Sequence, residues 1–174
     1  MNQQITKITL LGYMGSGKST VARILGEKLG LPVIDLDDYI ALKEELSIPE
    51  IFETRGEIYF RKIEYVYLQE LLNSEQSFVL ALGGGTPCYG NNMDAILEAS
   101  DSCYLKASLA TLTERLTAEK SHRPLIAGLD EEQLTEFIAK HLFERRNFYE
   151  RAARIINIDA KSPEQIAGEI IQLR

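Results

Sequence analysis

The sequence predicts a three-layer α/β fold, in which helices cover both faces of a parallel sheet. Short apolar runs alternate with segments of helical periodicity along the chain, as they do where crossover helices join parallel strands. The first apolar run ends in a glycine-rich turn that opens a helix. No internal repeat or interdomain linker interrupts the 174 residues. We therefore expect a single domain over residues 1–174.

The composition is typical of a compact globular protein, with 45% hydrophobic and 26% charged residues. No apolar run is long enough to span a bilayer, and residues 1–4 do not resemble the start of an export signal. A net charge of −7 argues against a broad nucleic-acid surface. Cys88 and Cys103 are too few for a disulfide scaffold or a structural zinc site. We expect a cytoplasmic monomer that binds neither nucleic acid nor membranes.

The first expected strand, Ile8-Thr9-Leu10-Leu11, leads into a motif that matches the phosphate-binding P-loop without a mismatch. Apolar residues then recur at helical spacing from Lys18 until Gly30. Backbone N–H groups at such a turn, together with the helix N-terminus, attract phosphate. A glycine-rich turn that binds nothing is the alternative, but the required strand and helix are both present. The motif predicts a nucleoside triphosphate site made by Gly15, Ser16, Gly17, Lys18, Ser19 and Thr20.

Acidic residues end the second expected strand, which covers about 31–36. Residues two apart on an extended segment face the same side, so Asp35 and Asp37 point together toward the sheet edge where ligands bind. Mg²⁺ prefers oxygen ligands, and we expect Ser19 and Asp35 to hold it. Helix capping is the alternative for this run, and we expect it of Asp38, before a helix over 39–46.

Two further helical segments follow, one from Pro49 toward Gly56 and a longer one over about 57–73. On the longer helix, spacings of four and three place Glu57, Arg61 and Glu64 on one side. Such a triplet is more often a solvated face than a site. It becomes a candidate anion clamp only if the rest of the chain needs one.

The third expected strand, residues 77–82, runs directly into Gly83-Gly84-Gly85. A buried strand that ends in glycines predicts backbone lying close against a ligand. Many P-loop proteins have an acidic residue that binds metal at this position. Here the position is glycine, so metal binding is expected to depend more on Ser19 and Asp35. A flexible turn without function is the alternative.

A long polar loop, about 119–131, is the next feature with functional potential. Before it we expect a helix over 91–99, a strand over 102–105 and a helix over 109–118 that carries Arg115. Loops of this length in compact domains are often lids. Arg123 lies in this loop and could neutralise charge on a transferring phosphoryl group, although it could also be an ordinary surface arginine.

Arg145 interrupts the apolar stripe of a helix expected over about 131–153. An inward guanidinium needs an anionic partner, either a structural carboxylate or a substrate. His141 on the same stripe reads as a hydrogen-bonded core residue. A fifth strand over 154–159 and a helix capped by Ser162 complete the chain.

A small-molecule kinase accounts for these features better than a GTPase. The chain has no Asn-Lys-x-Asp stretch to read guanine and no Asp-x-x-Gly switch after its third strand. A kinase needs a nucleotide site, a metal, a lid and a second substrate pocket, and the sequence offers candidates for all four.

Six features in order along the chain resemble the shikimate kinase family. They are Gly12 to Thr20, Asp35-Leu36-Asp37, Phe60 to Glu64, Gly83-Gly84-Gly85, Arg123-Pro124-Leu125 and Arg145 to Tyr149. The resemblance covers nearly the whole chain. It implies a P-loop kinase fold with five parallel strands in the order 2-3-1-4-5 and a lid that closes over ATP. It also implies transfer of the ATP γ-phosphoryl group to the 3-hydroxyl of shikimate, with Mg²⁺, in aromatic amino-acid biosynthesis.

The resemblance also implies roles for single residues. Asp37 is similar to the carboxylate that holds the reacting hydroxyl, and Asp35 to the one that orders Mg²⁺. Arg61 and Arg145 resemble the pair that grips the shikimate carboxylate, within a substrate-binding region of about 38–73. The remaining implied roles belong to Lys18 and Arg123 at the phosphates, Gly83, Gly84 and Gly85 at the substrate, Glu64 in support of Arg61, and Arg115 and Lys161 beside adenine.

Two other functions remain open at the level of sequence. One is a kinase of the same architecture acting on gluconate or a nucleotide. The other is a non-catalytic nucleotide-binding module, although such a module could lose Asp35 and Asp37, which are both present here.

Overall fold

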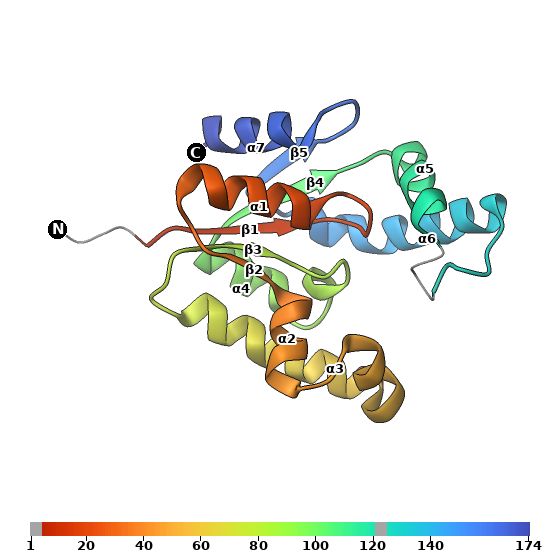
Figure 1. Ribbon diagram of the computed structural model, residues 1–174, viewed down its shortest axis with the longest axis horizontal. Coiled ribbons are helices and arrows are strands. Elements are labelled where there is room, and N and C mark those ends of the chain that lie inside the picture. Colours follow the sequence, from red (N-terminus) through yellow and green to blue (C-terminus); the bar gives the residue numbers. More distant parts are fainter. Residues whose placement is uncertain (1–4, 121–124) are drawn as a thin grey trace.

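One parallel sheet of five strands forms the centre of the computed structural model, which describes residues 5–120 and 125–174 (Figure 1). The strand order is β2-β3-β1-β4-β5, and every neighbouring pair is parallel. The predicted fold class and strand order are confirmed. The strands are β1 (Lys7–Leu11), β2 (Val33–Asp35), β3 (Phe78–Ala81), β4 (Asp101–Lys106) and β5 (Arg154–Asn157).

Helices cover both faces of this sheet and extend beyond its edge. Helices α1 and α7 pack against each other, and α3 packs against α4 (Figure 1). Two lobes project past the strands, one built by α2 and α3 and the other by α5 and α6 (Figure 1). The helices are α1 (Lys18–Leu29), α2 (Leu36–Glu44), α3 (Ile48–Asn73), α4 (Asn92–Ala99), α5 (Leu109–Glu119), α6 (Glu131–Tyr149) and α7 (Pro163–Gln172), with a short 3-10 helix η1 (Thr86–Cys88).

The central strands are buried because helices cover both of their faces. All four residues of β3 are buried, and so are the last four of β1. The register places Leu10 beside Ala81 and Ala81 beside Asp35. The carboxyl ends of β1, β3 and β2 therefore meet at one edge, which gathers the P-loop, the glycine triplet and the acidic run.

Several details differ from the sequence-based expectations, and the ends of β2, α2 and β5 are among them. Helix α2 begins at Leu36, and its cap is Asp35, whose Oδ1 accepts from the backbone N–H groups of Asp37 (3.0 Å) and Asp38 (3.4 Å). The expectation that Asp38 caps this helix is wrong, because the extended backbone of Asp35 leaves Asp38 inside the first turn. Helix α6 ends at Tyr149 rather than near residue 153, and η1 was not expected.

Other details agree with the sequence. Gly56, with φ 80° and ψ 173°, breaks α3 between the two helical segments that the sequence predicts. Ser162 caps α7 by accepting from the backbone N–H of Gln165. His141 is hydrogen-bonded as expected, since its Nδ1 lies 3.0 Å from the Tyr13 hydroxyl, but it is only half-buried on α6 and is not a core residue.

Candidate active site

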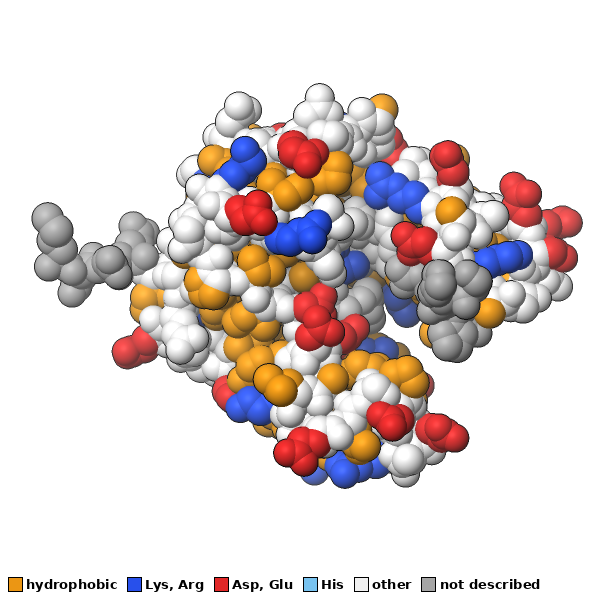
Figure 2. Space-filling view, viewed as in Figure 1, with side chains coloured by type: hydrophobic (Ala, Val, Ile, Leu, Met, Phe, Trp, Pro, Cys, Tyr) orange, Lys and Arg blue, Asp and Glu red, His pale blue; other side chains and the backbone are white. Residues whose placement is uncertain are grey.

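A cleft of about 570 Å³ opens at the carboxyl ends of the strands. Figure 2 shows the surface hollowed between the α2–α3 lobe and the α5–α6 lobe. Its lining includes Lys18, Ser19, Asp35, Asp37, Gly84 and Arg115. Phosphate-binding, acidic and glycine-rich segments that are distant in sequence thus share one cavity.

The P-loop wraps tightly around the N-terminus of α1. Gly12 has φ 147°, and a Cβ there would lie 2.8 Å from the carbonyl oxygen of Leu105, so both the backbone and the space require glycine. Lys18 Nζ donates to the carbonyl oxygens of Gly12 (2.8 Å) and Tyr13 (3.0 Å). These bonds hold the ammonium at the turn where phosphate would bind.

Ser19 and Asp35 lie side by side on the cleft wall. Ser19 Oγ donates to Asp35 Oδ2 over 2.9 Å, while Asp35 Oδ1 caps α2. A hydroxyl and a carboxylate are hard oxygen donors that suit Mg²⁺, which keeps several waters and takes further oxygens from phosphate. Within residues 5–120 and 125–174, no group of three or more His, Cys, Asp or Glu could hold a metal alone. The hydroxyl of Ser19 and the carboxylate of Asp35 are oxygen donors that fit an ion taking its other ligands from water or phosphate.

Asp37 presents its carboxylate to the glycine triplet. A Cβ on Gly83 would lie 3.3 Å from Asp37 Oδ1. The pKa of Asp37 is raised from 3.8 to about 6, chiefly by burial and also by the nearby charges of Asp35 and Glu64, while Lys18 opposes them. A carboxylate with a pKa this close to neutrality accepts a proton more readily than an ordinary aspartate does.

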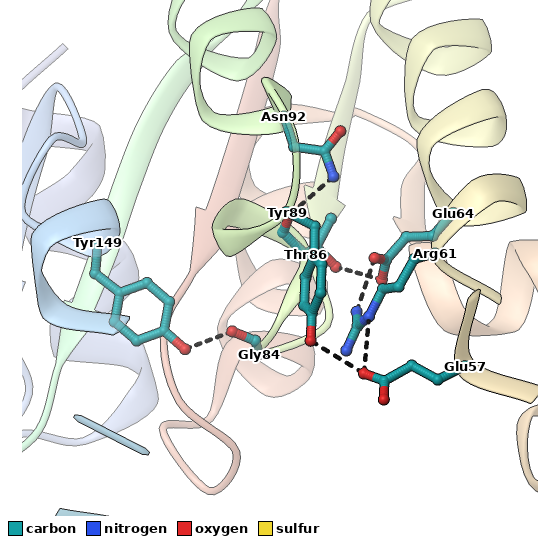
Figure 3. Close-up of polar contacts among 8 residues, drawn as sticks. All are labelled: Glu57, Arg61, Glu64, Gly84, Thr86, Tyr89, Asn92 and Tyr149. Atoms are coloured by element: carbon teal, nitrogen blue, oxygen red, sulfur yellow. Dashed lines mark hydrogen bonds and ion pairs between the residues drawn. The ribbon is translucent and has the colours of Figure 1, made fainter. Parts of the chain in front are cut away.

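Arg61 is held by a buried chain of hydrogen bonds (Figure 3). Its Nη1 donates to Glu64 Oε1 over 2.8 Å, and Glu64 is only 1% exposed. Thr86 Oγ1 donates to Glu64 Oε2 over 2.8 Å, and Asn92 Nδ2 donates to the carbonyl oxygen of Thr86 over 2.9 Å. Arg61 and Glu64 are therefore not part of a solvated face, because both are fixed against the glycine-rich loop, whereas Glu57 is exposed.

Arg145 approaches the same loop from α6. A Cβ on Gly84 would lie 3.4 Å from Arg145 Nη1, and one on Gly85 would lie 2.8 Å from Arg61 Nη2. Tyr149, one turn further along α6, donates its hydroxyl to the carbonyl oxygen of Gly84 (Figure 3). The structure thus brings two guanidinium groups from different helices to two consecutive glycines.

Arg145 differs from Arg61 in its partners. Its guanidinium carbon lies 5.6 Å from the centre of the Tyr13 ring. Across the described part of the chain, no carboxylate forms an ion pair with it. Of the two partners that the sequence left open for Arg145, a structural carboxylate is therefore not found among these residues.

Of the residues expected beside the phosphates and adenine, Arg115 lies in the cleft and Lys161 does not line it. Arg115 lines the cleft, and its Nη1 donates to the carbonyl oxygen of Gly15 over 3.1 Å. Lys161 pairs with Glu169 over 2.5 Å, and Pro163 rather than Lys161 lines the cavity. Arg123 falls outside the described residues.

Sequence reasoning expected Glu64 beside Arg61 but missed Thr86, Asn92 and Tyr89, which hold this pair in place. Thr86 follows the glycine triplet directly, and this position was the one available signal. Asn92 and Tyr89 gave none, because an asparagine in the first turn of a helix and a tyrosine in a loop are common. Their contacts depend on η1 turning the chain back toward α3.

The chain as a whole is similar to one family of known proteins. A family model described as shikimate kinase matches residues 14–174. A protein named shikimate kinase from Flavobacterium johnsoniae is 49% identical over 169 residues, which are 96% of this chain and 98% of that protein.

Two solved structures are similar over nearly their whole length. The shikimate kinase of Bacteroides thetaiotaomicron has a TM-score of 0.88 and 34% identity, covering 98% of this chain and 97% of that one. That of Acinetobacter baumannii, in complex with shikimate, has a TM-score of 0.87 and 32% identity, covering 98% and 93%.

Proposed function

Because this chain belongs to the shikimate kinase family, we propose roles in that family's reaction for the residues in and around its cleft. The protein transfers the γ-phosphoryl group of ATP to the 3-hydroxyl of shikimate, giving shikimate 3-phosphate and ADP. The proposed roles rest chiefly on one observation: Asp37, Arg61 and Arg145 all lie against the glycine triplet beside the P-loop.

The phosphates of ATP bind along the P-loop. The backbone of Gly15 to Thr20 surrounds the β-phosphate at the N-terminus of α1, and Lys18 moves from the carbonyl oxygens of the turn to the outer phosphates. Ser19 and Asp35, whose side chains lie side by side, would hold Mg²⁺. When bound, the ion neutralises charge on the phosphates. Arg123, on a lid of about 119–131, adds positive charge at the transferring group.

Shikimate lies between α3 and α6, over the glycine triplet. Arg61 and Arg145 bind its carboxylate, which a guanidinium fork fits better than an ammonium does. The backbone of Gly83, Gly84 and Gly85 lets the ring approach closely. Asp37 then holds the reacting hydroxyl and takes its proton as the phosphoryl group arrives. Positioning and charge neutralisation supply most of the rate enhancement.

The remaining proposals concern the surroundings of the site. Residues 1–174 form one domain, with a substrate-binding region of about 38–73. Arg115 and Lys161 flank adenine; for Arg115 the support is its place in the cleft, and for Lys161 it is family resemblance alone. A cytoplasmic monomer without nucleic-acid partners agrees with the two free thiols and the acidic net charge. No helix in the described segments has the length and apolar character needed to cross a membrane.

One assay tests the proposed roles together with the acceptor. ADP release is measured with ATP and Mg²⁺ alone, and then with shikimate, gluconate or a nucleoside monophosphate. We expect shikimate alone to stimulate release, because the chain belongs to the shikimate kinase family and two guanidinium groups beside Asp37 suit a hydroxylated carboxylic acid. Stimulation by a nucleotide instead would contradict the acid-binding role of Arg61 and Arg145, and stimulation by gluconate instead would contradict shikimate as the acceptor.

A Gly85→Ala substitution is expected to raise the KM for shikimate about tenfold and leave the KM for ATP unchanged. The new Cβ would lie 2.8 Å from Arg61 Nη2 and must displace the guanidinium. The backbone at Gly85 has φ −88° and ψ −17°, which alanine adopts without strain. Steady-state kinetics in both substrates measure the effect.

Gly168→Ala is the matched control for this substitution. A Cβ at Gly168 meets nothing within 4 Å, so this change inside α7 should leave kinetics unchanged and slightly stabilise the fold. If Gly85→Ala leaves the KM for shikimate unchanged, the proposed role of Arg61 in binding the acid is contradicted.

A further inference from the structure

Tyr89 lies directly against the guanidinium group of Arg61. The guanidinium carbon is 3.9 Å from the centre of the Tyr89 ring, closer than any other cation–ring pair among the residues that the structure describes. Figure 3 shows Tyr89 between the glycine-rich loop and Arg61. At 3.9 Å the ring packs on the face of the guanidinium, and the attraction of a cation for an aromatic face favours that arrangement.

The hydroxyl end of Tyr89 is fixed as well. It donates to Glu57 Oε1 over 3.0 Å, and the same carboxylate oxygen lies 3.7 Å from Arg61 Nε. Tyr89, Glu57 and Arg61 therefore form a closed ring of contacts. The backbone of Tyr89 follows η1, whose first residue, Thr86, is hydrogen-bonded to Glu64. Tyr89 is thus held at its backbone and at its hydroxyl.

These contacts restrain Arg61 in a way that Glu64 alone does not. The bond from Nη1 to Glu64 fixes one edge of the guanidinium but allows its plane to turn about that bond. A ring stacked on one face removes this freedom. The Nη2 edge then stays above Gly85, where a Cβ would lie 2.8 Å away. An arginine whose plane is already set loses less conformational freedom when it binds a planar carboxylate.

The exposure of Tyr89 argues against a simple packing role. Its side chain is 39% exposed, so it contributes little to the hydrophobic core. Its recorded side-chain contacts are with Arg61 and Glu57, which are both polar.

We propose that Tyr89 is a positioning residue, which holds the plane of the Arg61 guanidinium for two-point binding of the carboxylate of the acceptor. This inference rests on the proposed role of Arg61 in binding the acid. The side-chain contacts of Tyr89 are with Arg61 and Glu57, and not with the P-loop or Asp37, where ATP and the reacting hydroxyl are proposed to bind. Its loss should therefore affect recognition of the acid rather than the chemical step.

The test compares Tyr89→Leu with Tyr89→Phe and Tyr65→Leu. Tyr89→Leu removes the stack, and we expect a KM for shikimate raised about fivefold with kcat and the KM for ATP within twofold of wild type. Tyr89→Phe keeps the ring and should recover most of the affinity. Tyr65 is 41% exposed on α3 and is matched to Tyr89 in exposure, so its replacement should not alter shikimate binding.

A double substitution separates positioning from general destabilisation. In an Arg61→Lys background there is no planar fork to orient, so adding Tyr89→Leu should raise the shikimate KM no further. An unchanged KM in Tyr89→Leu, or the same fivefold increase on top of Arg61→Lys, would overturn the role of Tyr89.

The same variants distinguish this inference from the acid-binding role itself. If Arg61→Lys raises the shikimate KM while Tyr89→Leu does not, only the inference about Tyr89 fails. If Arg61→Lys leaves the KM unchanged, the role of Arg61 in acid binding fails and the inference about Tyr89 fails with it.

Discussion

An Asp37→Asn variant is expected to lose on the order of 10³-fold in kcat while it binds ATP nearly as well as the wild type. The amide keeps the shape of the side chain but accepts no proton from the hydroxyl of shikimate. The P-loop bonds of Lys18 do not involve Asp37, so the nucleotide site should persist. Single-turnover kinetics and equilibrium titration with ATP measure the two quantities separately.

Asp38→Asn is the matched control. Asp38 is the next residue on α2 and is exposed. Asp38→Asn therefore removes one negative charge from the same helix turn, at a side chain that does not reach the glycine triplet. We expect nearly normal turnover. A wild-type kcat in Asp37→Asn, or an equal loss in Asp38→Asn, would show that Asp37 is not the proton acceptor.

The stability of Asp37→Asn in the absence of metal provides an independent test of the raised pKa of Asp37. The pKa of Asp37 is raised from 3.8 to about 6, mainly by burial, so the folded state binds more protons than the unfolded state between these values. Stability contributed by this group therefore falls as pH rises through that window. In a chelator at pH 7, Asp37→Asn should be more stable than wild type by about 1–2 kcal/mol, allowing for solvent at the cleft. The gain should vanish below about pH 4.

An Arg145→Ala variant is expected to raise the KM for shikimate by about 10- to 100-fold, the equivalent of losing charge-assisted hydrogen bonds of about 1.5–3 kcal/mol. Arg145→Lys should recover only part of the affinity, because an ammonium cannot form the two-point fork. The KM for ATP should change little. Kinetics with each substrate varied in turn make the measurement.

The fold should tolerate the loss of Arg145 better than the loss of Arg61. Arg145 forms no ion pair with a carboxylate in the described residues, so its removal leaves no unpaired charge among them. Removing Arg61 would leave Glu64, 1% exposed, without its cation, at a cost of about 3–5 kcal/mol.

Arg146→Ala is the control for Arg145. Arg146 is exposed and pairs only loosely, at 3.8 Å, with Glu150. A folded Arg145→Ala protein that keeps the wild-type shikimate KM, or an Arg146→Ala protein that matches its defect, would contradict the proposed acid-binding pair.

Local sequence patterns were enough to predict much of the fold. The P-loop, the apolar strands and the break at Gly56 depend on residues adjacent in sequence, so spacing and residue type were enough to predict them. Helix boundaries were less certain. Asp35 was expected only as a metal ligand, yet it also caps α2, and a carboxylate after a strand can serve either purpose.

Long-range contacts could not be predicted in the same way. Nothing in the sequence near Glu64 shows that it is buried, because its burial depends on Thr86 and Asn92 arriving from another part of the chain. Lys161 could be placed in a loop, but its pairing with Glu169 depends on how α7 packs.

The sequence by itself determined the chemistry available to this protein: a phosphate loop, two carboxylates after the second strand, a glycine triplet and two arginines on separate helices. Only the tertiary structure decided that both arginines face consecutive glycines, and that Tyr89 stacks on Arg61 while Arg145 has no carboxylate partner among the described residues. The reason is physical. Residue types and short-range spacing set which groups are present, whereas the packing of α3 and α6 against the same sheet edge sets the distances between them.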